Sequence, residues 1–197
     1  MRALMSLVAL VSLASACASV PTSSGPPQAA GVAHEGEVRF LLGGGALDKE
    51  TWEPTDKPVI LGAEYARQEA DSWLGYELGT RLGIDTATAG GVDLTLVTFE
   101  FYGGYHHTFR ADSDFRPYVG AGAAIVSATA DASDGFVSVN DDDVTFGLYA
   151  HAGVAWDLGG WVLGLDGRYL GGTDVDLFGG SWDVDMTQVC LFGGFGI

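Results

Sequence analysis

The sequence is poor in basic residues and in cysteine. Lys and Arg number 9 against 26 Asp and Glu, which gives a formal net charge of −17. A chain this acidic, with no basic patch, repels phosphate backbones, so nucleic acid is excluded as an expected partner. Its two cysteines are Cys17 and Cys190. If Cys17 is removed or acylated, no intramolecular disulfide remains, and we interpret Cys190 as a packed thiol.

Long apolar runs are also missing from the body of the chain. After residue 34 there is no heptad pattern, no apolar stretch of about 20 residues and no long repeat, which argues against coiled coils and helical membrane spans. The 197 residues suit one folding unit. With 30 glycines, 47% hydrophobic and only 18% charged residues, the composition is unusual for a soluble domain. We therefore expect strands to account for most of the chain.

The first residues have the layout of an export signal. Arg2 precedes an apolar run over 3–13, and small residues follow over 14–18, so we predict a signal over residues 1–18 and an extracytoplasmic mature chain. The segment before Cys17 resembles a bacterial lipobox, in which that cysteine is acylated. Cleavage after Ala16 or Ala18 satisfies the small-residue rule equally well, so both alternatives stay open. Residues 19–34 are rich in Pro, Ser, Gly and Ala and predict a flexible linker.

The dominant pattern beyond the linker is an alternation with a period of two residues. In the segment 74–84 one face is Leu, Tyr, Leu, Thr, Leu and Ile, and the other is Gly, Glu, Gly, Arg and Gly. Segments of this kind approach the roughly 10 residues that a tilted strand needs to cross a bilayer. Eight candidates have this pattern: 37–46, 58–67, 73–84, 92–105, 116–128, 143–157, 160–171 and 186–197. An even number of strands can close into an antiparallel barrel.

The connections between these segments alternate in length. We predict long polar links at 47–57, 129–142 and 172–185, and short turns at 68–72 and 158–159. This matches the long external loops and short periplasmic turns of outer-membrane barrels. The link 106–115 is longer than the rule requires and 85–91 is shorter, so these two joints fit the topology least well.

Alternation alone does not say which face points outward, and a soluble lipocalin-like barrel has the same period. A water-facing strand surface normally carries Lys, Glu and Thr, but here the polar face is mostly Gly and Ala with a few charges. Small residues suit the inside of a narrow barrel. The other face carries Val, Leu, Ile and Phe, with Tyr and Trp near strand ends, as in a lipid-facing band. We therefore favour a membrane barrel over residues 35–197.

One motif carries a family resemblance. Residues 115–123, Phe-Arg-Pro-Tyr-Val-Gly-Ala-Gly-Ala, resemble a strand opening that recurs in small outer-membrane β-barrels of the OmpA-like superfamily, and the segments 76–83 and 165–170 resemble other strands of that superfamily. The final strand is similar to its C-terminal assembly signal, although the chain ends Phe195-Gly196-Ile197 and no peptidoglycan-binding domain follows. The resemblance implies an all-β, eight-stranded antiparallel up-and-down transmembrane barrel in the Gram-negative outer membrane.

Certain partners follow from that expectation. They are outer-membrane lipid, lipopolysaccharide and the barrel-insertion machinery, and we expect a monomer.

Charged residues on the small-residue face are the first candidate site. They are Glu77, Arg81, Glu100, Asp166 and Arg168. In a narrow lumen an unpaired charge is costly, so these groups are expected to form at least one ion pair between strands. Four residues along a strand span roughly 13 Å, so Glu77 and Arg81 each need a partner elsewhere. A structural network is favoured over a gate, because side chains nearly fill an eight-stranded barrel.

Aromatic residues near strand ends are the second candidate. If the first strand enters from the periplasm, Tyr65, Tyr105, Trp156 and Trp161 should form one girdle at the periplasmic rim.

Acidic triplets in the proposed external loops are the third candidate. The segments 141–143, 174–176 and 183–185 offer oxygen ligands suited to calcium or magnesium, but none matches an EF-hand loop, and solvated acid is the default. We expect no resident metal and no cofactor.

An enzyme is the rival class, because some small barrels modify lipid acyl chains. His106, His107 and His151 are available as bases, but no GxSxG elbow or His-x-Ser element accompanies them. We expect a non-enzymatic barrel with a structural, adhesive or surface-interaction role. A narrow gated pore for small solutes is the first alternative, and an outer-membrane lipid-modifying enzyme is the second.

Overall fold

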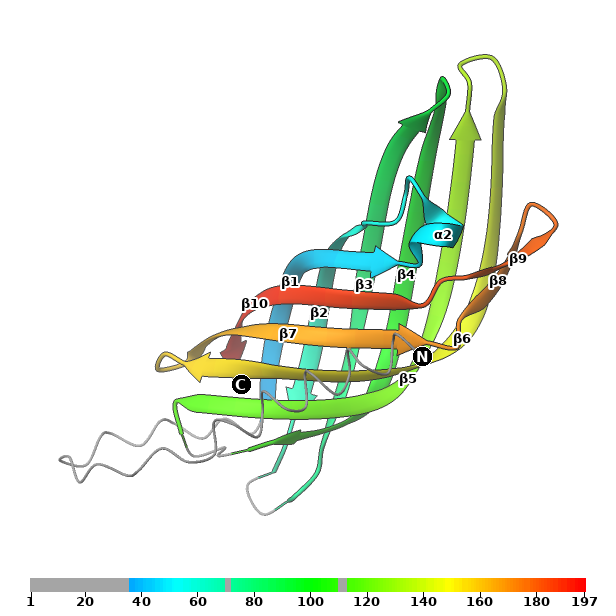
Figure 1. Ribbon diagram of the computed structural model, residues 1–197. Coiled ribbons are helices and arrows are strands. Elements are labelled where there is room, and N and C mark those ends of the chain that lie inside the picture. The colour runs from blue at the N-terminus through cyan, green and yellow to red at the C-terminus, as the bar shows by residue number, and fades with distance from the viewer. Residues whose placement is uncertain (1–35, 70–71, 110–112) are drawn as a thin grey trace.

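The computed structural model describes residues 36–69, 72–109 and 113–197, and these form a closed antiparallel barrel (Figure 1). The predicted export signal over 1–18, with Cys17, and the predicted linker over 19–34 lie outside the described residues. The wall strands follow one another around the barrel in chain order, and β1 closes it against β10. They are β1 (Gly36–Leu47), β2 (Val59–Arg67), β3 (Gly75–Ala89), β4 (Val92–Thr108), β5 (Phe115–Ser133), β6 (Ser138–Asp157), β7 (Trp161–Gly171) and β10 (Met186–Gly196).

The predicted all-β, eight-stranded antiparallel barrel is confirmed, but two predicted links are wrong. Most of 129–142 belongs to β5 and β6, and only residues 134–137 turn. Most of 85–91 belongs to β3, and the turn consists of Gly90 and Gly91, both with positive φ, which suits a two-residue hairpin. Strands β3 to β6 continue beyond the other strands (Figure 1). Beyond the barrel, neither face of a strand needs to be continuously apolar, so the alternation that marks a wall strand is lost there.

The two ends of the barrel differ in character. The terminal end carries the first and last described residues, Gly36 and Ile197, which bond to each other through their backbones, together with the connections β2–β3, β4–β5 and β6–β7. The loop end carries the other four connections. Two of these hold extra elements, which are the one-turn helix α2 (Lys49–Trp52) and the hairpin of β8 (Asp174–Leu177) and β9 (Gly180–Asp183). Among the described residues no helix is long and apolar enough to cross a membrane.

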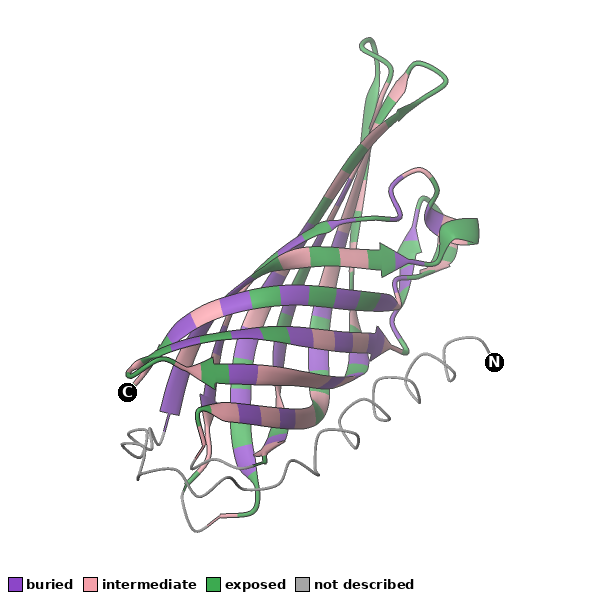
Figure 2. Ribbon diagram, turned by 60° about the vertical axis from the view of Figure 1, so that its left-hand side comes forward, coloured by how far each residue is buried: buried purple, intermediate pink, exposed green. Residues whose placement is uncertain are grey.

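Burial alternates along the wall strands, as the bands in Figure 2 show. In β10, Gln188 and Cys190 are fully buried, whereas Val189 and Leu191 are 54% and 67% exposed on the outer face. Inward-facing glycines make room for large side chains. A Cβ atom at Gly79, for example, would lie 2.5 Å from the ring of Tyr102. The small-residue face therefore lines the lumen, and the outer face of the barrel is apolar.

Buried apolar side chains close the interior at the loop end. In this layer, Trp52 of α2 and residues of the β8–β9 hairpin pack against the loop-end parts of the wall strands. Its members include Trp52, Ile60, Leu96, Val126, Leu170, Val175, Leu177, Val184 and Met186. The interior thus has an apolar layer at the loop end and a charged layer nearer the terminal end.

Candidate functional sites: the charged lumen and the loop-end pocket

All five charged residues singled out in the sequence lie in the lumen, and none is more than 3% exposed. Two ion pairs form among them. Arg81 of β3 lies 2.8 Å from Asp166 of β7, and Arg168 of β7 lies 3.0 Å from Glu100 of β4. Both pairs link strands that are not neighbours in the wall, so they cross the lumen rather than follow it.

Gln188 of β10 joins these two pairs. Arg81 donates from Nη1 to the Gln188 side-chain oxygen at 2.7 Å, and the Gln188 amide nitrogen donates to Glu100. Arg81 and Glu100 are direct partners in the β3–β4 register, yet the Arg81 guanidinium bonds to Asp166 on the far side. A neutral amide therefore connects the two ion pairs across the barrel.

Glu77 finds its partner in a histidine that the sequence reasoning considered only as a base. The ring of His151 lies between two carboxylates, with Nδ1 2.8 Å from Asp166 and Nε2 3.0 Å from Glu77. Both carboxylates can only accept when ionised, so this geometry requires an N–H on each ring nitrogen, and His151 is an imidazolium. Tyr118 donates to Asp166 and Tyr149 donates to Glu77. His151 is therefore a structural cation of the lumen.

The second histidine of the lumen is His106, which the sequence reasoning also considered only as a base. His106 lies within β4, is 3% exposed, and its Nδ1 is 3.8 Å from Glu77. Its neighbour His107 points the other way and stacks on Trp73, with ring centroids 4.9 Å apart. Successive side chains of a strand point to opposite faces, so His106 faces the lumen and His107 faces outward.

A further cluster near the terminal end was missed from the sequence. Arg39 of β1 pairs with Glu37 at 2.9 Å and with Glu64 of β2 at 3.0 Å, and Arg116 of β5 pairs with Glu37 and lies 3.6 Å from Asp157. The signal was available, because Glu37 and Arg39 alternate with the outward residues of β1.

Arg168 is also held by aromatic rings. Its guanidinium carbon lies 4.2 Å from the ring centroids of both Tyr102 and Tyr149, and the Tyr102 hydroxyl donates to Glu64 at 2.8 Å. Aromatic faces stabilise a cation that has lost its hydration shell, and the tyrosine hydroxyls donate hydrogen bonds to the carboxylates. The tyrosines therefore connect the two charged clusters.

The lumen charges nearly balance once His151 is counted as a cation. Four arginines and His151 face five buried carboxylates, which are Glu37, Glu64, Glu77, Glu100 and Asp166. Asp157, beside Arg116 at the terminal end, adds a sixth. Because this network spans the lumen from β1 to β7, a solute would have to displace paired charges to pass.

One group of lumen side chains has the spacing of metal ligands. One ligand atom each from Glu64, Glu77 and His151 lies within 4.8 Å of the others. These atoms already serve the ion pairs and hydrogen bonds described above. A metal ion there would compete with Arg39 and with the proton of His151, so the donor set fits an ion-pair network better than a cation site.

The four predicted girdle residues share one end of the barrel. Tyr65 lies near the end of β2, Tyr105 near the end of β4, Trp156 at the end of β6, and Trp161 begins β7. All four positions belong to the terminal end. The rings of Tyr65 and Tyr76 are 6.1 Å apart. This places an aromatic belt around the outer surface at the terminal end.

The acidic triplets lie at the loop end, and two aspartates of the first triplet hold the β8–β9 hairpin. Asp143 of β6 accepts the backbone N–H of Asp176 at 2.7 Å, and Asp141 accepts that of Phe178 at 2.7 Å. The N–H groups of Asp176 and Val144 hold the pKa of the Asp143 carboxyl below its usual value. Asp141–Asp143 belong to a strand and not to the loop that the sequence predicted.

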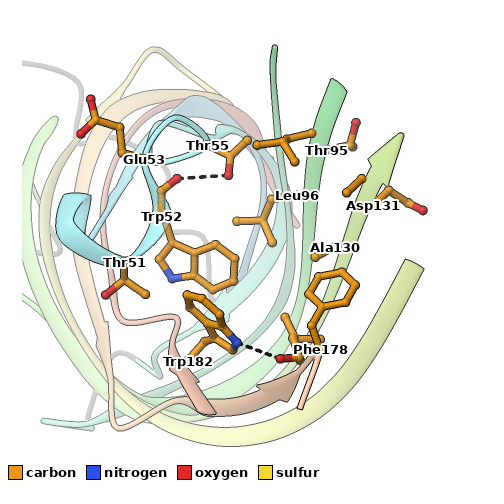
Figure 3. A pocket seen from close by; sticks show the side chains of 13 residues that line it. Thr51, Trp52, Glu53, Thr55, Thr95, Leu96, Ala130, Asp131, Phe178 and Trp182 are labelled. Atoms are coloured by element: carbon orange, nitrogen blue, oxygen red, sulfur yellow. Dashed lines mark hydrogen bonds between the residues drawn. The ribbon is translucent and has the colours of Figure 1, made fainter. Parts of the chain in front are cut away.

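A pocket of about 190 Å³ opens at the loop end, where four separate segments meet (Figure 3). Trp52 comes from α2, Phe178 and Trp182 from the β8–β9 hairpin, and the floor comes from β4 and β5, including Leu96 and Ala130. The Trp52 and Trp182 rings are 5.9 Å apart. Figure 3 shows the rings of Trp52, Trp182 and Phe178 around the same space. Sequence reasoning missed this pocket entirely.

Hydrogen bonds fix the orientation of both indoles. Trp52 Nε1 donates to the carbonyl of Asp183 at 2.6 Å, and Trp182 Nε1 donates to that of Leu177 at 2.8 Å. Phe178 has a φ of 53° and precedes Gly179 in the tight turn of the hairpin. This left-handed conformation costs a bulky residue about 1–2 kcal/mol, and glycine or asparagine is usual there. A strained phenylalanine thus stands at the mouth of the pocket, 49% exposed.

The comparisons with known proteins agree with this architecture. No protein-family model matches the chain, and no curated protein matches it. Among solved structures, Neisserial surface protein A (NspA) is 14% identical with a TM-score of 0.56, and the match covers 82% of this chain and 96% of NspA. The chain has the fold of a small outer-membrane β-barrel. The expected likeness to OmpA-like barrels is thereby confirmed at the level of fold.

Two further structures support the same conclusion. Ail, the attachment invasion locus protein of Yersinia pestis, is 15% identical with a TM-score of 0.55, over 82% of this chain and 96% of Ail. The outer-membrane protein OprG of Pseudomonas aeruginosa is 15% identical with a TM-score of 0.51, over 83% of this chain and 96% of OprG. Identities this low establish the fold and leave the role to be argued from the site.

Proposed function

We propose that this protein is a monomeric, non-enzymatic barrel of the Gram-negative outer membrane, with a sealed lumen and a surface-interaction role at its loop end. The observation that carries the proposal is the ion-pair network across the lumen, because a barrel filled with paired charges offers surfaces and not a passage. The apolar outer face and the aromatic belt at the terminal end support insertion into a bilayer. In this orientation the terminal end faces the periplasm.

The loop end is the part that supports an interaction role. Strands β3 to β6 extend beyond the barrel as two hairpins, and Phe136 in the β5–β6 turn is 98% exposed beside Val137. Exposed apolar groups at a hairpin tip are suited to contact with another surface. The heparin analogue bound to Ail is polyanionic, whereas the loop end of this chain is acidic, so we do not transfer that ligand to it. Contact with lipopolysaccharide phosphates would need bridging divalent cations.

Fractionation with heat-modifiability on a gel tests the membrane assignment. A folded outer-membrane barrel is expected in the membrane fraction and to migrate differently before and after boiling in detergent. A soluble periplasmic protein with no shift would overturn the proposal. Mass analysis of lipid A, with and without the protein, tests the non-enzymatic role, and we expect no change in acylation.

Planar-bilayer conductance separates a sealed barrel from the narrow gated pore, which is the alternative. We expect no channel events from the wild-type protein and none from Arg81→Ala, whose effect should be a loss of stability because Asp166 loses its partner. Near-neutral stability of Arg81→Ala, with raised conductance, would instead establish a gated pore.

A further inference from the structure

The pocket at the loop end offers the rings of Trp52, Phe178 and Trp182 beside aliphatic side chains such as Leu96 and a few polar groups. Both indole N–H groups are bonded to backbone carbonyls, as described above. The Thr51 and Thr55 hydroxyls on its edge also donate within the protein, to Asp48 at 2.9 Å and to the carbonyl of Trp52 at 3.2 Å. A strongly polar ligand such as a sugar would therefore find these donors already engaged. What remains for a ligand is mainly the aromatic surface of Trp52, Trp182 and Phe178, with aliphatic side chains beside it.

The charge around the pocket is strongly negative. The four loop-end segments, 48–58, 85–93, 131–143 and 174–185, hold fifteen Asp and Glu against two Lys, with no Arg or His. Such a field repels carboxylates, phosphates and sulfates and raises the local concentration of cations. Two acidic residues, Glu53 and Asp131, belong to the pocket lining. In Figure 3 their carboxylates point away from the aromatic rings, so they add negative charge at the edge of the pocket.

Size limits the ligand to a single compact group. An apolar cavity of about 150 Å³ is enough to hold benzene, so a pocket of about 190 Å³ takes one ring or one group of similar bulk. The exposed fraction of Phe178 shows that the pocket reaches the surface. A larger molecule could therefore place one head group inside while the rest of it stays outside.

These observations together select an organic cation. Aromatic faces attract ammonium groups through the ring quadrupole, tryptophan most strongly, and quaternary ammonium groups are recognised in this way. We propose that the loop-end pocket of Trp52, Phe178 and Trp182 binds a compact organic cation of the quaternary-ammonium class. The cation is either free or the head group of a larger molecule. The inference gives the proposed surface role a ligand class, and in that sense it rests on the proposed function.

The strained turn gives a selective variant. Phe178→Gly removes one ring of the pocket and leaves a residue that adopts positive φ without cost, so the hairpin should be retained. Trp182→Leu removes a second ring. Phe146→Ala, which removes an exposed ring on the outer face of β6, is the matched control.

Isothermal titration with choline, on protein folded in an alkyl-glucoside detergent without ammonium groups, tests the proposal. We expect saturable binding that weakens at least tenfold in Phe178→Gly and in Trp182→Leu, is unchanged in Phe146→Ala, and weakens with salt. The neutral isostere 3,3-dimethyl-1-butanol should bind at least tenfold more weakly than choline. Equal binding of the two, no binding of choline, or binding indifferent to both aromatic variants would overturn the proposal.

A second arm separates the two sources of the ligand. Phosphatidylcholine vesicles, compared with phosphatidylglycerol vesicles, test whether a head group at a lipid surface is bound as well as free choline. Retention on the first vesicles, lost in Phe178→Gly, assigns the lipid head group, and retention on neither assigns the free cation. Because heat-modifiability and conductance do not depend on this pocket, failure of choline binding leaves the proposed membrane barrel intact, and failure of those assays leaves the binding result intact.

Discussion

The lumen and the loop end of this barrel solve opposite electrostatic problems. In the lumen every carboxylate of the network has a cation beside it, and one of those cations is a histidine held between two acids. At the loop end fifteen acidic residues share two lysines. Water supports unpaired charge at the loop end, whereas the narrow lumen does not. Most of the net charge of −17 therefore belongs to one end of the molecule.

The difference teaches what charge contributes in each region. In the lumen, pairing fixes side chains in one arrangement and fills space that apolar residues would otherwise occupy. At the loop end, acidic side chains either face water or, like Asp143, cap backbone N–H groups of a neighbouring hairpin. The first use makes stability depend on each partner. At the loop end, each acidic side chain that faces water is nearly dispensable for stability, while the summed charge sets which ligands approach.

Breaking one lumen pair should have the largest effect. Arg168→Met keeps most of the side-chain volume but leaves Glu100 without its cation, so we expect a loss of about 3–5 kcal/mol in the free energy of unfolding. Urea unfolding of the protein in lipid vesicles measures it. The double variant Arg168→Met/Glu100→Gln removes the stranded charge and should recover much of the loss. A cost below about 1 kcal/mol for the single variant would mean that water reaches the lumen.

A charge placed on the outer face of the barrel tests whether that face contacts lipid. Leu191 lies near the middle of β10 and faces outward, so Leu191→Arg should cost about 2–4 kcal/mol in a bilayer. Thr187→Arg, on the same outer face but close to the loop end, should cost about 0–1 kcal/mol. The same urea titration compares them. Equal and small costs for both variants would indicate that the outer face contacts water.

The wall of the barrel was predictable because it repeats one local rule. Along β3, Glu77, Gly79 and Arg81 alternate with Leu78 and Thr80, which places the charges on one face. The small residues of that face then assign it to the lumen. The partners were less predictable, since Arg81 bonds to Asp166 across the barrel and not to Glu100, its neighbour in register. Which of several buried acids a long arginine reaches depends on three-dimensional packing that alternation does not describe.

The loop end was the least predictable region. Asp141, Asp142 and Asp143 resemble a loop in sequence, yet they continue β6 beyond the barrel, where the alternation of a wall strand is no longer required. The contact of Trp52 with Trp182 joins segments 130 residues apart, and no local pattern announces it. A pocket assembled from such contacts follows from the closed fold and not from any single motif.

The hydrogen bond from the Asp176 N–H to the Asp143 carboxylate, which holds the β8–β9 hairpin, should weaken at low pH. Because its pKa is lowered, ionised Asp143 stabilises the bond to Asp176 fully above about pH 4, and this contribution is lost as the pH falls through the lower folded value. Protection of the Asp176 amide proton against exchange, corrected for the intrinsic rate, should be constant from about pH 7 to 5 and fall below about pH 4. Asp143→Asn, which keeps an acceptor without a charge, should remove that pH dependence. Unchanged protection in Asp143→Ala would show that the hairpin is held by other contacts.

The smallest effect is expected where an acid faces water alone. Asp142 is exposed on β6 between two other aspartates, so Asp142→Asn should change the free energy of unfolding by no more than about 0.5 kcal/mol. At low salt Asp142→Asn should stabilise the protein slightly, because the substitution relieves repulsion among neighbouring carboxylates. The gain should vanish near 1 M salt, where the Debye length is only about 3 Å. Parallel urea titrations at about 0.01 M and 1 M salt measure both. A loss comparable to that of Arg168→Met would mean that this carboxylate has a structural partner, and the division between a paired lumen and an unpaired loop end would not hold.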